Sequence, residues 1–238
     1  HLRPIYISPT TAITITIDNL TAIARACVRI RLRQRRRLVQ YASRFIIWYM
    51  KDAKDSQTLI WRVKKLEAAM TSSRKLFRMF NSVEFLTKAI DSLAEKDDYL
   101  RYLSVIGMTG KGIWLLFDHL LWFGKIDMFK VNPRYSRVSA WAWLAANIAL
   151  TLRDLRKLHL LRMRTVTLKQ APQEEIKEDY CNLRPLVVAV QLELAKDFCD
   201  IFIPLATLGY ADTGLAAAGG VISSVIAMQQ EWGKIVKN

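Results

Sequence analysis

A glycine-rich segment in the middle of the chain holds the residue types of a nucleotide-binding loop. It reads Gly107-Met-Thr-Gly110-Lys111-Gly112. A phosphate-binding loop needs four residues between its glycines and a Ser or Thr directly after the Lys. Here two residues separate Gly107 from Gly110, and a glycine follows the Lys. We therefore interpret these glycines as points of close helix packing and expect no nucleotide and no other cofactor.

The titratable residues give no better catalytic candidate. Asp118 and His119 are adjacent, and neighbouring residues on a helix point about 100° apart, so they do not face one another. The three cysteines are far apart and show no metal-binding spacing, which argues against a zinc site and against a disulfide framework. The sequence therefore predicts a protein that is not an enzyme and holds no metal.

The net charge and its distribution point to an anionic partner. The chain has 238 residues, is 52% hydrophobic and carries a formal charge of +15. Residues 1–90 contain 18 Lys and Arg against 5 Asp and Glu, whereas residues 91–238 contain 18 against 16. Such an asymmetry is typical of proteins that bind nucleic acid or the anionic face of a bilayer.

Two stretches near the start combine an apolar stripe with a cationic one. In residues 31–50 and 57–93, apolar residues recur every three or four positions, which is the spacing of one helix face. We predict two basic amphipathic helices and leave open a break near Asn81. The residues expected to contact a membrane are Arg33, Arg37, Arg44, Arg62, Lys65, Arg74, Lys75, Arg78, Leu59, Val63, Leu66, Met70 and Phe77.

The rest of the chain is also predicted to be helical. Further helices are expected near residues 99–123, 134–161 and 186–232, and the acidic pair at 97 and 98 suits a helix start. Only residues 10–17, where Thr alternates with Ile, resemble a strand. The predicted fold is an all-α, membrane-associated bundle of five or six helices. Its expected parts are an atypical arm (1–30), a basic amphipathic region (31–96), a helical core or membrane-embedded region (97–161), a polar linker (162–185) and membrane-embedded C-terminal helices (186–238).

The C-terminal segment is the strongest candidate for insertion into a membrane. Residues 215–232 are nearly free of charge, although a spanning helix needs about 20 apolar residues. Small residues recur there four positions apart, which is the spacing that lets two helices approach closely in lipid. The residues expected to mediate self-association are therefore Gly214, Ala218, Gly219, Ser223, Gly220 and Ser224.

Three functions agree with these patterns. In the first, the apolar stripes enter the acyl boundary of an anionic leaflet and the basic residues contact its headgroups, which curves the membrane. The second is a pore for small metabolites, indicated by the candidate intramembrane polar residues Arg101, Lys111, Asp118 and Asp200. The third is a soluble adaptor whose basic stripes are solvated faces. Nucleic acid is not expected as a partner, because the sequence carries no nucleic-acid-binding signature.

Several short motifs, in order, resemble one known family. They are Arg36-Arg-Leu-Val-Gln-Tyr-Ala-Ser-Arg-Phe45, Ser73-Arg-Lys-Leu-Phe-Arg78, Leu116-Phe-Asp118-His-Leu-Leu-Trp122, Leu152-Arg-Asp-Leu-Arg-Lys-Leu158, Asp200-Ile-Phe-Ile-Pro204, Gly219-Gly-Val-Ile-Ser223-Ser224 and Trp232. Across residues 35–236 the chain resembles the peroxisomal membrane peroxin eleven family, which drives peroxisome elongation and proliferation.

The resemblance implies more than the residues alone indicate. It implies a protein of the peroxisomal membrane that associates with itself, tubulates the membrane before fission and works with the dynamin-type fission machinery. Residues 57–80 resemble the family's remodelling helix, and the pore function has also been proposed for the family. The chain departs from the family pattern in residues 1–30 and at Met79-Phe80-Asn81.

Overall fold

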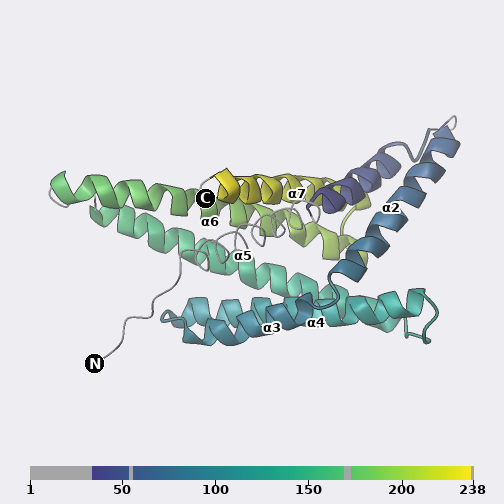
Figure 1. Cartoon of the computed structure of the whole chain (residues 1–238), viewed down its shortest axis with the longest axis horizontal. Helices are drawn as coiled ribbons and strands as arrows, with labels where there is room; N and C mark the ends of the chain where they lie inside the picture. The colour runs from purple at the N-terminus through teal and green to yellow at the C-terminus, as the bar shows by residue number, and fades with distance from the viewer. Residues whose placement is uncertain (1–33, 54–55, 169–172, 237–238) are drawn as a thin grey trace, which may run out of the picture.

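The computed structural model describes residues 34–53, 56–168 and 173–236, and the secondary structure in these ranges is entirely helical (Figure 1). This confirms the predicted all-α class. The strand-like segment at 10–17 and the arm at 1–30 lie outside the described residues. The described helices are residues 34–49, α2 (Gln57–Phe77), α3 (Asn81–Asp91), the short 3-10 helix η2 (Ser92–Ala94), α4 (Asp98–Lys125), α5 (Arg134–Leu168), α6 (Gln173–Leu208) and α7 (Thr213–Val236).

The helices pack mainly against their neighbours in the sequence. α3 lies on α4, α4 on α5, α5 on α6 and α6 on α7 (Figure 1). The helix at 34–49 runs beside α7, so the two ends of the described chain meet. α2 crosses obliquely from this pair to the layer formed by α3 and α4, where it contacts α4. It also contacts the helix at 34–49, since Gln40 donates to the Thr71 hydroxyl at 2.7 Å and Arg44 lies 2.7 Å from Glu67.

Local signals explain where several helices begin and end. The Asp97 carboxylate accepts a hydrogen bond of 3.0 Å from the backbone N–H of Leu100 at the start of α4, which confirms the predicted helix start. Gly209, with φ +87°, ends α6 in the left-handed conformation that glycine adopts easily. Asp212 then accepts from the backbone N–H of Gly214 at 2.8 Å and supports the start of α7.

The central glycines bring α4 and α5 close together. A Cβ atom placed on Gly107 would lie 2.6 Å from the Leu150 side chain, and one on Gly110 would lie 2.9 Å from the Cβ of Ala146. Any larger residue would force the two helices apart. The structure therefore confirms that these glycines pack helices.

The structure corrects three expectations about the helices. The described residues hold seven α-helices rather than five or six, because 57–93 divides at residues 78–80 and 186–232 divides at 209–212. The expected polar linker at 162–185 is largely helical, since α5 continues to Leu168 and α6 begins at Gln173. Its polar residues are compatible with helix, because Arg, Leu, Met, Glu and Lys are all good helix formers.

The expected membrane-embedded helices find no support in helix length and hydropathy. Among the described residues, every helix falls short of the combination of length and apolar character that a bilayer crossing requires. Charged residues interrupt the long helices, as Lys111 and Asp118 do in α4.

Candidate functional site

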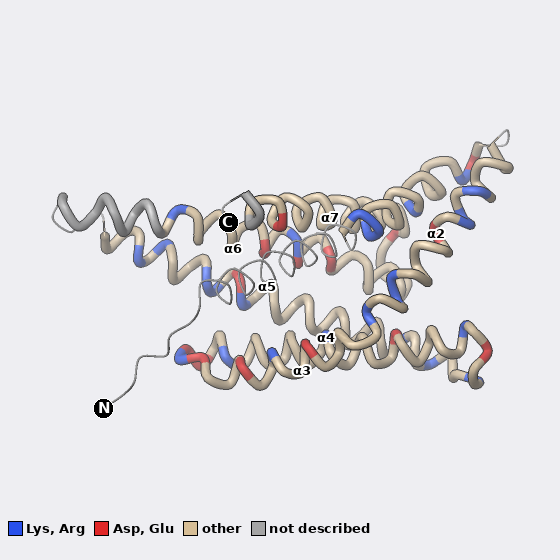
Figure 2. The backbone as a smooth tube through the Cα atoms, viewed as in Figure 1, with Lys and Arg blue, Asp and Glu red and all other residues tan. Residues whose placement is uncertain are grey.

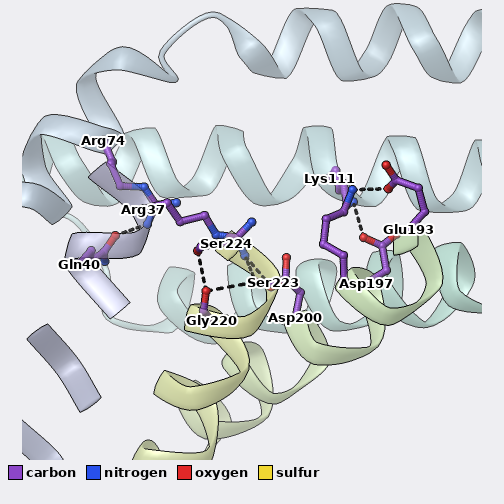
Figure 3. Close-up of polar contacts among 11 residues, drawn as sticks. Arg37, Gln40, Arg74, Lys111, Glu193, Asp197, Asp200, Gly220, Ser223 and Ser224 are labelled. Atoms are coloured by element: carbon purple, nitrogen blue, oxygen red, sulfur yellow. Dashed lines mark hydrogen bonds and ion pairs between the residues drawn. The ribbon is translucent and has the colours of Figure 1, made fainter. Parts of the chain in front are cut away.

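Charged residues occur along all the helices (Figure 2), and several of them form ion pairs between helices. The guanidinium of Arg37, on the helix at 34–49, lies 2.5 Å from a carboxylate oxygen of Asp200 on α6. The same guanidinium donates to the Ser223 hydroxyl on α7 at 2.9 Å (Figure 3). Burial is the largest single effect and lowers the pKa of the Arg37 guanidinium, but Asp200, Tyr41 and Asp197 together outweigh it and raise this pKa. One side chain thus joins three helices.

Three further ion pairs connect other helices. Asp118 on α4 accepts from Lys75 at 2.7 Å and from Arg78, just beyond the end of α2, at 2.9 Å. Lys111, also on α4, lies 3.8 Å from Asp197 on α6 (Figure 3). Burial lowers the pKa of Lys111, and Asp197 offsets part of this effect. These pairs attach α2 and α6 to the central helix α4.

Arg74 on α2 differs from these residues. Its guanidinium contacts the side-chain oxygen of Gln40 and the Tyr41 side chain, and no carboxylate of the described residues lies within ion-pair distance. Burial lowers the pKa of Arg74 to about 9; Tyr41 raises it in part, and the nearby Arg78 and Arg37 lower it further. The protein therefore keeps a buried positive charge that none of these carboxylates compensates.

These basic residues line a common cavity. It has a volume of about 570 Å³ and lies among the helix at 34–49, α2, α3, α4, α5 and α6. Its wall combines five cations, one carboxylate and five aromatic rings. The lining residues are Gln34, Arg36, Arg37, Tyr41, Arg74, Phe77, Arg78, Asn81, Phe85, Lys111, Trp114, Leu115, Trp143, Asn147 and Asp200.

The outer faces of α2 and α3 carry large apolar side chains as well as charged ones. α3 buries the small residues Ser82 and Ala89 against its neighbours and leaves Val83 and Ile90 62% and 68% exposed. In α2 only Ile60 is buried. Phe80, between the two helices, is 81% exposed. Large exposed apolar surfaces mark contact with a membrane or another protein.

The predicted membrane-contacting residues separate into two groups. Leu59, Leu66 and Phe77 are exposed, Val63 and Met70 are half-buried, and Arg62 and Lys65 are exposed cations in the first half of α2. The other basic residues contact their own chain: Arg37, Lys75 and Arg78 form the ion pairs above, Arg74 contacts Gln40, and Arg44 lies 2.7 Å from Glu67. Arg33 lies outside the described residues.

The small residues of α7 pack within the chain. A Cβ on Gly214 would lie 2.2 Å from the ring of Trp48, and one on Gly220 would lie 2.3 Å from the ring of Tyr41. Gly219 approaches the backbone carbonyl of Cys199 on α6 in the same way. Ser223 and Ser224 are fully buried, and Ala218 is half-buried. Self-association through these residues stays a prediction.

Of the four candidate intramembrane polar residues, Lys111 and Asp200 line the same cavity, whereas Asp118 and Arg101 do not line it. Lys111, Asp118 and Asp200 take part in the interhelical ion pairs described above. Arg101 pairs locally with Asp98 at 2.5 Å near the start of α4. The pore function predicted from them stays a prediction.

Several ion pairs thus lie between the helices, and large apolar side chains are exposed on α2 and α3, which marks these surfaces as contact surfaces. The family model described as Peroxisomal biogenesis factor 11 (PEX11) matches residues 34–232, so the chain belongs to this family. This confirms the resemblance noted in the motifs.

Individual relatives agree with the family assignment. Peroxisomal membrane protein 11A of Mus musculus and that of Homo sapiens are each 24% identical to the chain, and the matches cover 81% of the chain and 87% of each relative. Peroxisomal biogenesis factor 11 of Schizosaccharomyces pombe is 21% identical, over 82% of the chain and 87% of that relative. No solved structure matches the chain. The chain is therefore a peroxisomal membrane protein involved in peroxisome proliferation.

Several residues of the interior were not singled out in the sequence. Gln40, Tyr41 and Asn147 line or border the cavity, and Trp48 contacts the glycine at the start of α7. Gln40 and Tyr41 do occur in the first family motif, Arg36–Phe45, and this motif was the sequence feature that could have indicated their role. Asn147 lies in an apolar helix, where a lone amide could have been noted as a buried polar group.

Proposed function

We propose that the protein remodels the peroxisomal membrane by inserting the outer faces of α2 and α3 into an anionic leaflet. The observation that carries the proposal is the inverted packing of α3. This helix buries Ser82 and Ala89 and presents Val83 and Ile90 outward. In water, the exposure of Val83 and Ile90 would lose the free energy that burial of these apolar side chains provides. Beside the acyl chains of a membrane, the same side chains would have an apolar environment.

The first half of α2 supplies the electrostatic part of the contact. Arg62, Lys64 and Lys65 are all exposed there, beside the exposed side chains of Leu59 and Leu66. Each basic residue near an anionic leaflet contributes about 1 kcal/mol to binding. The combination of an apolar face and adjacent cations is typical of helices that lie in the headgroup region. A wedge of this kind expands one leaflet and favours curvature.

Self-association and a link to the fission machinery are parts of the same proposal. Leu215, Ile222 and Val225 lie exposed on the outer face of α7, where a second copy could pack. Several copies side by side would add their wedges and elongate the membrane. Recruitment of dynamin-type fission proteins comes from the family resemblance, and no structural feature named here is assigned to it.

A vesicle assay tests the proposal. Purified full-length protein is mixed with phosphatidylcholine vesicles that contain about 30% phosphatidylserine, then sedimented and examined by electron microscopy. We expect binding and tubules with the wild type. Arg62→Glu combined with Lys65→Glu should weaken binding at least about tenfold, because two attractions of about 1 kcal/mol each are replaced by repulsions.

The matched control is Arg162→Glu with Arg164→Glu. It makes the same change in net charge at two exposed positions near the end of α5, away from the proposed contact. We expect this control to bind and tubulate nearly as the wild type does. Equal loss in both double variants would mean that net charge alone matters, and would remove the assigned role of α2.

A further inference from the structure

The cavity at the centre of the structure carries more positive charge than its surroundings balance. Of its lining cations, Arg37 is paired with Asp200, Arg78 with Asp118, and Lys111 lies near Asp197. Arg74 has no carboxylate partner among the described residues. A buried charge without a counterion destabilises the folded protein by several kcal/mol. An anion bound in the cavity would therefore stabilise it.

Two hydrogen-bond donors on the cavity wall are also unused. The Nδ2 atom of Asn147, a residue only 1% exposed, has no acceptor within the described part of the chain. The same holds for the Nε atom of Arg37. Buried polar groups are hydrogen-bonded in the great majority of cases, so two orphaned donors in one cavity indicate a missing acceptor.

The rest of the wall suits an organic group. Trp114 and Trp143 stack with ring centroids 4.3 Å apart, and Phe77 and Phe85 contribute two more rings. A volume of about 570 Å³ lies within the usual range for pockets that hold small ligands. Cations and rings are interleaved on this wall, since the guanidinium of Arg36 lies 4.1 Å from the centre of the Phe77 ring and that of Arg78 lies 5.0 Å from the Trp114 ring. Such a lining fits a ligand that has an anionic group and a less polar body.

We propose that this cavity binds an organic phosphate, with the phosphate group held by Arg74, Asn147 and the free Nε of Arg37. A phosphate oxygen accepts well from both a guanidinium and an amide, and its negative charge would offset that of Arg74. The organic part packs against the apolar side chains of Phe77, Phe85 and Leu115. This site is separate from the outer surface of α2 in the proposed function, because Arg62 and Lys65 do not line it.

Two sources of such a ligand share this chemistry: the headgroup of an anionic phospholipid and a soluble phosphate ester. Isothermal titration calorimetry on the full chain in neutral detergent separates them. The probes are dioctanoyl phosphatidic acid and glycerol 3-phosphate, with dioctanoyl phosphatidylcholine as the zwitterionic comparison. Binding of the phosphatidic acid alone supports the lipid source, and binding of both anionic probes supports the soluble ester. The proposal is overturned if neither anionic probe binds, or if phosphatidylcholine binds as tightly as phosphatidic acid.

Variants connect binding to the cavity. Arg74→Gln keeps hydrogen-bonding capacity but removes the charge, and we expect at least tenfold weaker binding of the anionic probe. Because the ligand-free protein loses an uncompensated buried charge, the melting temperature of this variant should equal or exceed that of the wild type. The second variant, Asn147→Leu, removes the unused donor and should also weaken binding.

The control Arg62→Gln changes an exposed cation of the same helix and should bind the probe as the wild type does. The same control distinguishes the two proposals, because it should weaken vesicle binding while leaving the cavity intact. A folded Arg74→Gln protein that binds phosphatidic acid with wild-type affinity would overturn the site, whatever the vesicle assay shows.

Discussion

The guanidinium of Arg37 lies 2.5 Å from the carboxylate of Asp200, and this ion pair joins helices that are 163 residues apart in the sequence. Both side chains are largely removed from solvent. Ser223 adds a third helix through its hydroxyl, at 2.9 Å from the same guanidinium. The contact therefore closes the fold by holding its first described helix against the last two.

Replacing Asp200 by Asn should destabilise the protein strongly. The guanidinium of Arg37 would stay buried without its counterion, and breaking one side of a buried pair typically costs about 3–5 kcal/mol. Thermal unfolding followed by circular dichroism measures the loss. The double variant Arg37→Met with Asp200→Leu should recover most of it, because no charge is left buried. A double variant as unstable as Asp200→Asn would show that the charge balance is not the cause.

Enlarging Gly220 should loosen the contact between α7 and the helix at 34–49. The Cβ of Gly220→Ala would lie 2.3 Å from the Tyr41 ring, and overpacking of this kind costs about 1–3 kcal/mol. Hydrogen exchange of residues 34–49 should rise. Gly233→Ala is the matched control, because nothing lies within 4 Å of its Cβ in the same helix. The expected control result is unchanged exchange; faster exchange in both variants would contradict a local steric effect.

Sequence patterns predicted the local structure well, because helix starts and turns depend on neighbouring residues. The start of α4 at Asp97 and the division near Asn81 both followed from such signals. The linker expected at 162–185 was wrong, because polar composition was taken as loop although the residues favour helix.

The candidate site was much harder to predict, because it depends on which faces meet. The cationic stripe of α2 looked uniform in the sequence. In the fold, Arg62 and Lys65 face outward, whereas Arg74, Lys75 and Arg78 contact their own chain. The periodicity of the sequence cannot distinguish the outward-facing basic residues from those that contact the chain, because the difference depends on where α2 crosses α4.

Protonation of His119 should make stability depend on pH. Burial lowers the pKa of its imidazole below the ordinary value of 6.5, and Asp118 beside it offsets part of the effect. The unfolded chain then binds the proton more readily, so stability is complete above about pH 6.5 and falls as the pH drops below it. Melting temperatures at pH 7.5 and 5.5 should therefore differ more in the wild type than in His119→Gln. Equal differences would assign the pH dependence to other groups.

The proposed insertion of the apolar side chains of α2 and α3 into lipid is tested most directly by measuring how deep position 80 lies in the membrane. A nitroxide is attached to Phe80→Cys, and for comparison to Arg162→Cys, after Cys27, Cys181 and Cys199 are replaced by Ser. Electron paramagnetic resonance then compares collisions with oxygen, which concentrates in hydrocarbon, and with a water-soluble nickel complex. On vesicles with about 30% phosphatidylserine, we predict that the label at 80 meets mainly oxygen and the label at 162 mainly nickel. A label at 80 that stays as accessible to nickel as the one at 162, while the protein is bound to the vesicles, would contradict the account.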